Sequence, residues 1–233
     1  MVRNVIESQD MMEIKRWVMP REILLMTALV LVSAGVTLMV RSGYGISVAS
    51  SVPYVFSLHF TQLSFGTWTF IVYSAVILLL IALIRHFEWL YLVSFVISIF
   101  AGLFSDLFKY LWSFLPGGAL LHVLYYFAGW FCLSLGIASF VKSGLPPAPY
   151  ELFIREVSRF KNIPIGRAKT LFDLGCLTIS SLFLIFVVRR LVGIGIGTVV
   201  AGLFNGTVVG NWIRLMNRHL TMRSLLPIWK IPE

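Results

Sequence analysis

Residues 71–84 read IVYSAVILLLIALI, and this uncharged run extends an apolar segment that begins at Phe65. The segment from 65 to 84 is about as long as the 20 residues that an α-helix needs to cross the hydrocarbon core of a bilayer. Its hydrophobicity is continuous, which indicates a helix rather than the alternating pattern of a transmembrane β-strand. The run therefore predicts a membrane-spanning helix.

The composition of the whole chain agrees with that prediction. Of the 233 residues, 58% are hydrophobic and only 12% are charged, and the mean hydropathy is +0.89. A soluble domain carries about 25% charged residues, so this chain has too little charge to cover an apolar core in water. Further spans are expected at 23–40, 89–112, 120–141, 168–188 and 191–213. The sequence thus predicts an all-α integral membrane protein with about six transmembrane helices in the lipid bilayer.

Lysine and arginine residues fall mainly on one side of these spans. Of the 19, fifteen share the side of the N-terminus and four fall on the other, namely Arg41, Lys109, Arg189 and Arg190. Because cytoplasmic loops carry the excess of basic residues, both termini are expected in the cytoplasm, as segments 1–22 and 214–233. Within the first of these, Met11, Met12, Ile14, Trp17 and Val18 predict a short amphipathic stretch at the membrane interface.

The net charge of +9 is spread over the loops instead of forming a basic stripe, so no nucleic-acid partner is predicted. Cys132 and Cys176 lie inside apolar spans, and the four histidines are scattered along the chain. Neither a metal-ligand spacing nor a Ser-His-Asp or Cys-His pairing stands out. The sequence therefore predicts no metal, no cofactor and no enzymatic activity.

The chain also resembles itself at a separation of about one hundred residues. The segment GVTLMVRSG at 35–43 aligns with GIASFVKSG at 136–144, and SFGT at 64–67 aligns with PIGR at 164–167. The tetrapeptide AGLF at 101–104 recurs identically at 201–204. Three matches in the same order indicate a duplication, with one three-helix repeat at 23–112 and a second at 120–213.

An odd number of spans in each repeat means that the second repeat crosses the membrane in the opposite sense to the first. Inverted repeats of this kind are a common plan of secondary transporters. Each repeat also carries a short helix after its first span, at 46–58 and at 149–161. The nearly uncharged first segment favours a re-entrant helix, whereas Arg155, Arg159 and Lys161 favour an interfacial position for the second.

This pattern resembles the YczE/YyaS/YitT family of bacterial integral membrane proteins over most of residues 25–213. The residues that carry the resemblance are Gly35, Ser42–Ser47, Ser64–Thr67, Asp106, Gly136–Gly144, Pro149–Glu151, Ile165–Arg167, Thr170, Asp173 and Gly195–Thr198. The resemblance implies a multi-pass protein of the bacterial plasma membrane and says little about activity. The first copy departs from the family where Val48-Ala49-Ser50 replaces a proline, an aromatic residue and an aspartate, which removes an acid from one side of the pseudo-axis.

Three acidic residues are candidates for a binding site or pathway. Asp106 lies deep in the third span, where a carboxylate costs about 2.5–3.5 kcal/mol, so it is expected to bind substrate, proton or ion, or to pair with Lys109. Asp173 either lines the inner mouth of a pathway or pairs with Lys169 one turn earlier. Glu151 either contributes to the site or simply occupies the first turn of a helix, where the helix dipole favours an acid.

The two Ser-Gly breaks, Ser42-Gly43 and Ser143-Gly144, complete the candidate set because they interrupt corresponding spans. They are expected to converge with Asp106 near the midplane. On this basis the sequence predicts a transporter or permease-like protein for a small solute. Two alternatives stay open: a non-transporting subunit that assists or regulates another membrane complex, and a lipid-handling membrane enzyme or flippase. The substrate is not specified, nor whether a membrane partner or a homo-oligomer is involved.

Overall fold

The computed structural model of the protein describes residues 17–145, 148–189 and 193–224. Within these ranges six helices are long and apolar enough to cross a membrane. They are α2 (Arg21–Ser42), α4 (Phe65–Ile84), α5 (Trp89–Ser113), α6 (Ala119–Ser143), α8 (Ile165–Phe183), which continues as the π-helical turn η1 (Leu184–Val188), and α9 (Ile196–His219). The predicted all-α multi-pass membrane fold is confirmed.

Large apolar side chains cover the outside of this bundle. Leu78, Leu103 and Phe186 are 66%, 61% and 72% exposed and lie on three different spans. Water would not tolerate so much contiguous apolar surface, whereas the hydrocarbon of a bilayer solvates it.

The last span differs most from its predicted bounds. It begins at Ile196 instead of residue 191, because Gly193 adopts a φ of 84° and Gly195 forms the N-cap. It also continues beyond Ile213 to His219. Hydropathy marks where a helix leaves the hydrocarbon, but the backbone hydrogen bonds of the helix continue into the polar region.

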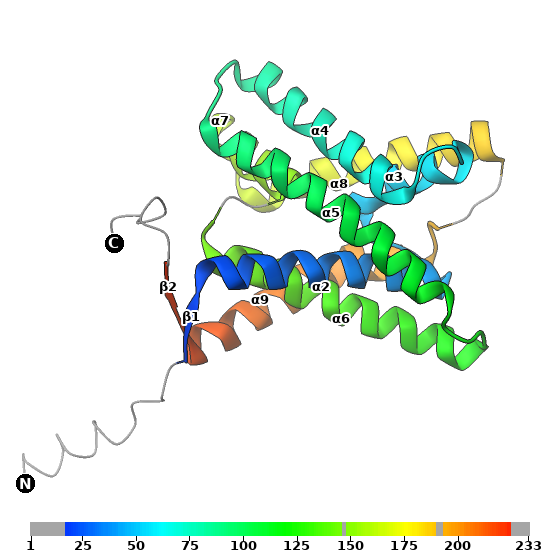
Figure 1. Ribbon diagram of the computed structural model, residues 1–233. Coiled ribbons are helices and arrows are strands. Elements are labelled where there is room, and N and C mark those ends of the chain that lie inside the picture. The colour runs from blue at the N-terminus through cyan, green and yellow to red at the C-terminus, as the bar shows by residue number, and fades with distance from the viewer. Residues whose placement is uncertain (1–16, 146–147, 190–192, 225–233) are drawn as a thin grey trace, which may run out of the picture.

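Helices α2 and α6 run antiparallel and form the centre of the bundle (Figure 1). Glycines bring their backbones together: a Cβ atom on Gly35 would lie 2.6 Å from the carbonyl oxygen of Gly129, and one on Gly136 would lie 2.9 Å from the backbone nitrogen of Val32. Helices inside a membrane usually associate through close packing of small residues, because the hydrophobic effect does not drive helices together in lipid.

The other helices are arranged around this pair in matching contacts. Helix α5 packs on α2, and α9 packs on α6. The short helix α3 (Val48–His59) packs against α8, and the short helix α7 (Pro149–Phe160) packs against α4. Helix α4 follows α3 in the chain, and α8 follows α7. Each short helix therefore packs against the span that comes directly after the other short helix.

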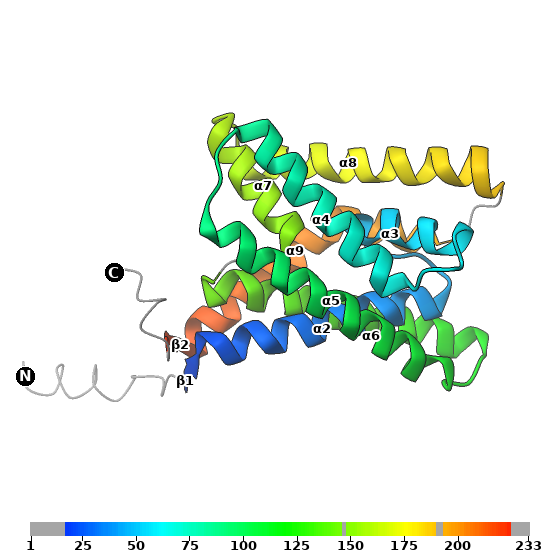
Figure 2. The same cartoon turned by 45° about the horizontal axis from the view of Figure 1, so that its top comes forward.

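Both short helices are inserted into the bundle, at opposite ends of it (Figure 2). Residues 48–55 of α3 are all buried, and α7 buries Pro149, Tyr150, Leu152, Ile154 and Glu156. The expectation that 149–161 lies flat at the interface therefore does not hold for the first half of α7. Its apolar face covers α4 and α8 instead of lipid, and amphipathic periodicity alone does not distinguish these two apolar neighbours.

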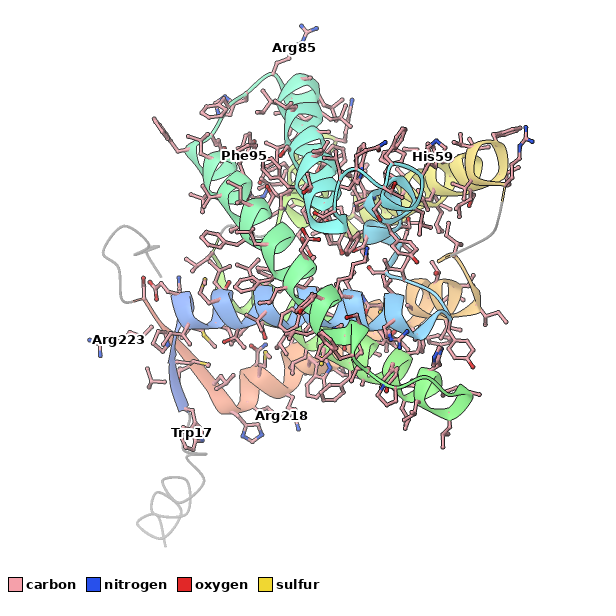
Figure 3. All side chains as sticks on the ribbon, turned by 45° about the vertical axis from the view of Figure 1, so that its right-hand side comes forward. Trp17, His59, Arg85, Phe95, Arg218 and Arg223 are labelled. Carbon is pink, nitrogen blue, oxygen red and sulfur yellow. The ribbon has the colours of Figure 1, made fainter. Side chains whose placement is uncertain are left out.

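The two ends of the described chain lie together. Strand β1 (Trp17–Pro20) pairs in parallel with strand β2 (Leu220–Arg223), and the hydroxyl group of Ser224 donates a 3.0 Å hydrogen bond to Glu22. Figure 3 shows Trp17, Arg218 and Arg223 grouped at this end. Trp17 and Val18 thus belong to a strand, whereas the rest of the predicted amphipathic stretch, Met11 to Ile14, lies outside the described residues.

Candidate functional site

A small cavity with both apolar and polar lining residues lies where the N-termini of α3 and α7 meet. Its volume is about 30 Å³, enough for one or two water molecules, and its walls come from α2, α3, α4, α5, α6 and α7. Hydroxyl and carboxylate side chains are concentrated in it: Ser33, Ser47, Ser50, Thr69, Tyr73, Ser105, Tyr150 and Glu151. An ionisable side chain is costly inside a membrane protein, so the presence of Glu151 among these groups makes the cavity a candidate site.

The two helix N-termini add partial positive charge to this cavity. Neither Ser47 of α3 nor Ala148 of α7 makes a side-chain capping hydrogen bond. The first N–H groups of a helix lack partners within that helix, and the helix dipole adds to their positive potential. Ser50 and Glu151, which the predicted alignment of the two halves pairs, both line the cavity, and only Glu151 of this pair is an acid.

Glu151 is the acidic group of this cavity. Its Oε2 atom is buried and has no hydrogen-bond partner, and no ion pair to Glu151 forms within the described part of the chain. The neighbouring acid of α7, Glu156, is in contrast paired with Arg155 at 3.1 Å and Arg159 at 3.5 Å. A buried carboxylate oxygen without a donor leaves a binding capacity that a proton or a ligand can fill.

Lys169 and Asp173 of α8 lie beside Tyr150. The Lys169 ammonium group is 2.9 Å from Asp173 Oδ2, which confirms the predicted i, i+4 pair, and it donates a 3.4 Å hydrogen bond to the Tyr150 hydroxyl group. The second oxygen of Asp173, Oδ1, is buried without a partner. Two unsatisfied carboxylate oxygens and one shared ammonium group therefore surround Tyr150.

A larger cleft joins this cluster to the end of the bundle where the termini lie. It has a volume of about 390 Å³ between α6, α7, α8 and α9, and it reaches Tyr150, Glu151 and Lys169. Its walls are mainly apolar and include Ile137, Phe140, Val141, Ile154 and Val209, whereas Asn205 adds a polar group. A cleft of this size with an apolar wall and a polar inner end is typical of small-molecule sites.

The cleft exists because α8 stands away from α9. Gly166 lines it from α8, and a Cβ atom on Gly166 would meet no atom within 4 Å. Gly206 of α9 has equally open surroundings, and a Cβ atom on Gly202 would make only an ordinary 3.5 Å contact with Val48.

We call the contact line between two neighbouring helices a seam. In the first half the corresponding seam, between α4 and α5, is closed, because the two backbones are in contact at Gly66 and Gly102. A Cβ atom on Gly66 would collide with the carbonyl oxygen of Gly102, and one on Gly102 would lie 2.6 Å from the carbonyl oxygen of Gly66. Asp106 holds the seam together, because its carboxylate accepts hydrogen bonds from the Ser64 hydroxyl group and, at 2.7 Å, from the Gly66 N–H group. In the second half Pro164 and Gly206 stand in place of Ser64 and Asp106.

This geometry gives Asp106 neither an ion pair with Lys109 nor a place in the central cavity. It does not pair with Lys109, whose ammonium group lies 5.9 Å from the centre of the Phe65 ring instead. Nor does Asp106 line the central cavity; it lies at the edge of a separate groove between α4 and α5.

The Ser-Gly breaks do not converge, contrary to expectation. The carbonyl oxygen of Ser42 lies 3.0 Å from His122 near the start of α6, whereas Ser143 ends that helix, so the breaks lie roughly 32 Å apart along the helix. Each break is a turn: Gly43 and Gly144 adopt left-handed φ values of 73° and 65°.

The two serines make the same local bonds in these turns. Ser42 donates to the Met39 carbonyl group at 2.6 Å, and Ser143 donates to the Phe140 carbonyl group at 2.7 Å. Their role in the described structure is to turn the chain toward α3 and α7.

Sequence reasoning missed Tyr150, Asn205 and Tyr73 as parts of the site. Tyr150 borders the central cavity, the cleft and a smaller cavity between them, and Tyr73 is hydrogen bonded to Ser50. Tyrosine and asparagine are common at membrane interfaces and in helix packing, so single residues of these types give no distinctive signal.

Comparison with known proteins gives one family. No curated protein and no solved structure matches the chain. Nothing in these comparisons links it to the YczE/YyaS/YitT family, so that resemblance stays a prediction. The sequence pattern of the family of unknown function DUF6198 matches residues 19–214, which include all six spans up to Arg214, and the chain therefore belongs to that family.

Proposed function

We propose that this protein is a transporter that moves a small solute by alternating access between two inverted repeats. The observation that carries the proposal is the contrast between the closed α4–α5 seam at Gly66 and Gly102 and the open α8–α9 seam at Gly166 and Gly202. Corresponding residues thus occupy two different states in one molecule. An inverted-repeat transporter exchanges these states when it turns from one face of the membrane to the other.

Several features support an inverted repeat. The turns at Ser42 and Ser143 make the same hydrogen bonds, and the contacts of α3 with α8 match those of α7 with α4. The corresponding helices α2 and α6 run in opposite directions (Figure 1). The excess of basic residues on the side of the termini favours the cytoplasm for that side. The cleft is then open to the cytoplasm of the cell and closed toward the outside.

The proposed cycle uses the central cluster as its binding site. A solute with an apolar body and a polar head enters the cleft and reaches Glu151, Tyr150 and Lys169. The α8–α9 seam then closes around Gly166 and Gly202, and Asp106 is released from Gly66. These two changes expose the same cluster to the opposite side of the membrane. The unpartnered carboxylate oxygen of Glu151, which lines both the central cavity and the cleft, favours this proposal over an accessory subunit.

Transport in reconstituted vesicles tests this function. Cys132 and Cys176 are replaced by serine, and cysteines are introduced at Gly166 and Gly202. Oxidation is expected to join them only when the seam closes, and the disulfide should stop uptake of solutes from a panel of small amphiphilic amines and acids. Reduction should restore uptake.

The matched control places cysteines at Gly166 and Gly210, because Gly210 lies two turns farther along α9. This pair should neither cross-link nor lose uptake. Uptake that continues in the fully cross-linked Gly166/Gly202 protein would contradict alternating access. Failure of every solute to exceed the leak of protein-free vesicles would contradict transport.

A further inference from the structure

A further pocket lies at the end of the bundle opposite the termini. It is about 330 Å³ in volume and lies between the last turns of α2 and α5, and it is lined by Thr37, Val40, Arg41, Lys109, Trp112 and Ser113. It shares no residue with the central cavity or the cleft. Two of its six lining residues are cationic and none is acidic.

Neither cation has an acidic partner within the described residues. Arg41 is held by a 2.6 Å hydrogen bond from one of its terminal nitrogens to the carbonyl oxygen of Leu115, while its Nε atom is buried and unpartnered. The nearest acid in sequence to Lys109 is Asp106, whose carboxylate is bound by Ser64 and Gly66. The pocket thus contains a guanidinium group that Leu115 holds in place and an ammonium group that contacts the Phe65 ring, and neither cation is neutralised by an acid in the described residues.

The neutral groups of the pocket are already satisfied inside the protein. The Trp112 indole N–H group donates to Thr37 at 3.1 Å, and the Ser113 hydroxyl group donates to the Tyr110 carbonyl group at 2.6 Å. The remaining binding capacity is therefore cationic. The negative end of the α2 dipole accounts for a basic residue in its last turn, but it does not satisfy the buried Nε atom of Arg41.

Their position on this side of the membrane strengthens the argument. The sequence predicts only four of the 19 basic residues on the side opposite the termini, and the fold brings two of them, Arg41 and Lys109, into one pocket. Exposed aromatic side chains surround this end of α5: Tyr110 is 64% exposed and Phe114 is 70% exposed. Aromatic residues of this kind mark the headgroup level of a bilayer.

We propose that this pocket binds a phosphate oxyanion, presented by a phospholipid headgroup or by a free phosphate ion. Arginine forms directed hydrogen bonds to phosphate oxygens, and lysine adds a point charge. The pocket lies apart from the transport pathway, so its occupancy and the transport activity are separate questions.

The experiment uses the full chain, delipidated in mild detergent, with binding measured by native mass spectrometry and by equilibrium titration. The three probes are dioleoylphosphatidylglycerol, dioleoylglycerol with the same acyl chains but no phosphate, and inorganic phosphate. The test variant is R41Q/K109Q. Its control is R85Q/R189Q, which loses the same two charges from exposed helix ends outside the pocket.

The wild type and R85Q/R189Q are expected to prefer the phospholipid to dioleoylglycerol, and R41Q/K109Q should lose about tenfold in affinity, as expected for lost charge-assisted hydrogen bonds. Binding of phosphatidylglycerol without inorganic phosphate assigns the pocket to a lipid headgroup, and binding of both assigns it to phosphate in general. Equal binding by R41Q/K109Q and the control, or no preference for phosphate at all, would overturn the proposal. If the double variant does not fold, the exposed Lys109 is changed alone, and K109Q must weaken binding relative to R85Q.

Discussion

Gly66 and Gly102 bring α4 and α5 into backbone contact, whereas their counterparts Gly166 and Gly202 do not touch. The same pairing of small residues thus has opposite outcomes in the two halves of one chain. Asp106 provides a physical reason, because it binds the first turn of α4 and has only Gly206 as its counterpart. The closed seam is stabilised by hydrogen bonds to the Asp106 carboxylate, and Gly206 cannot make such bonds in the open seam.

Replacing Gly66 with alanine should destabilise the closed seam. The added methyl group would collide with the carbonyl oxygen of Gly102, and overpacking of this kind costs about 1–3 kcal/mol. Thermal unfolding in mild detergent should show a lower melting temperature for Gly66→Ala. Gly166→Ala is the matched control, because its methyl group meets open space, and it should unfold close to the wild type. Equal losses in both variants would show that the seam is not closed as described.

Removing the Asp106 carboxylate should loosen the same seam from its polar side. Asp106→Ala removes two hydrogen bonds at the start of α4, and a bond to a charged group contributes about 1.5–3 kcal/mol. We expect a lower melting temperature and faster labelling of a cysteine at Thr67 by a water-soluble maleimide. Lys109→Gln should change neither quantity, since Lys109 does not pair with Asp106. A comparable effect of both substitutions would favour the ion pair between Asp106 and Lys109 that the sequence suggested.

Glu151 and Glu156 lie on the same helix and should respond differently to the same change. Glu151→Gln should abolish uptake in proteoliposomes while leaving the melting temperature close to that of the wild type, because the Oε2 atom has no partner to lose. Glu156→Gln breaks the pairs with Arg155 and Arg159 and should lower stability. Full uptake by Glu151→Gln would remove Glu151 from the proposed site.

Lys169 and Asp173 should show coupled effects on stability. Each single substitution, Lys169→Met or Asp173→Asn, leaves an uncompensated polar partner beside Tyr150, so the double variant should lose less stability than the sum of the two. For a partly buried pair at 2.9 Å a coupling free energy of about 1 kcal/mol is expected from a double-mutant cycle. Strict additivity would mean that the pair contributes nothing to the fold.

The inverted arrangement predicts opposite labelling of the two loops that follow the short helices. Thr61 follows α3 and Asn162 follows α7, and both are exposed. Single cysteines at these positions should react with an impermeant maleimide from opposite faces of oriented membrane vesicles, with Asn162→Cys reacting on the cytoplasmic face. Reaction of both from one face would exclude inverted repeats.

Much of the architecture follows from local chemistry that the sequence carries. The scarcity of charge requires lipid as the solvent. The length of an apolar run predicts the length of its span, and for Phe65–Ile84 both predicted bounds match the structure. The Ser-Gly pairs end α2 and α6 because glycine adopts the left-handed conformation and the preceding serine bonds to its own turn. The Lys169–Asp173 pair needs only the i, i+4 spacing of a helix.

The site itself depends on long-range packing. Whether Glu151 is paired, whether Asp106 binds Lys109 or the start of α4, and whether a pair of glycines closes or leaves a cleft all depend on how helices far apart in the chain meet. Lipid as the solvent, the spans and the turns could be predicted from the chain alone, because they result from interactions within a few residues. Which pair of helices is in close contact and which carboxylate oxygens lack a partner depend on packing, because AGLF at 101–104 and at 201–204 is one sequence in two different surroundings.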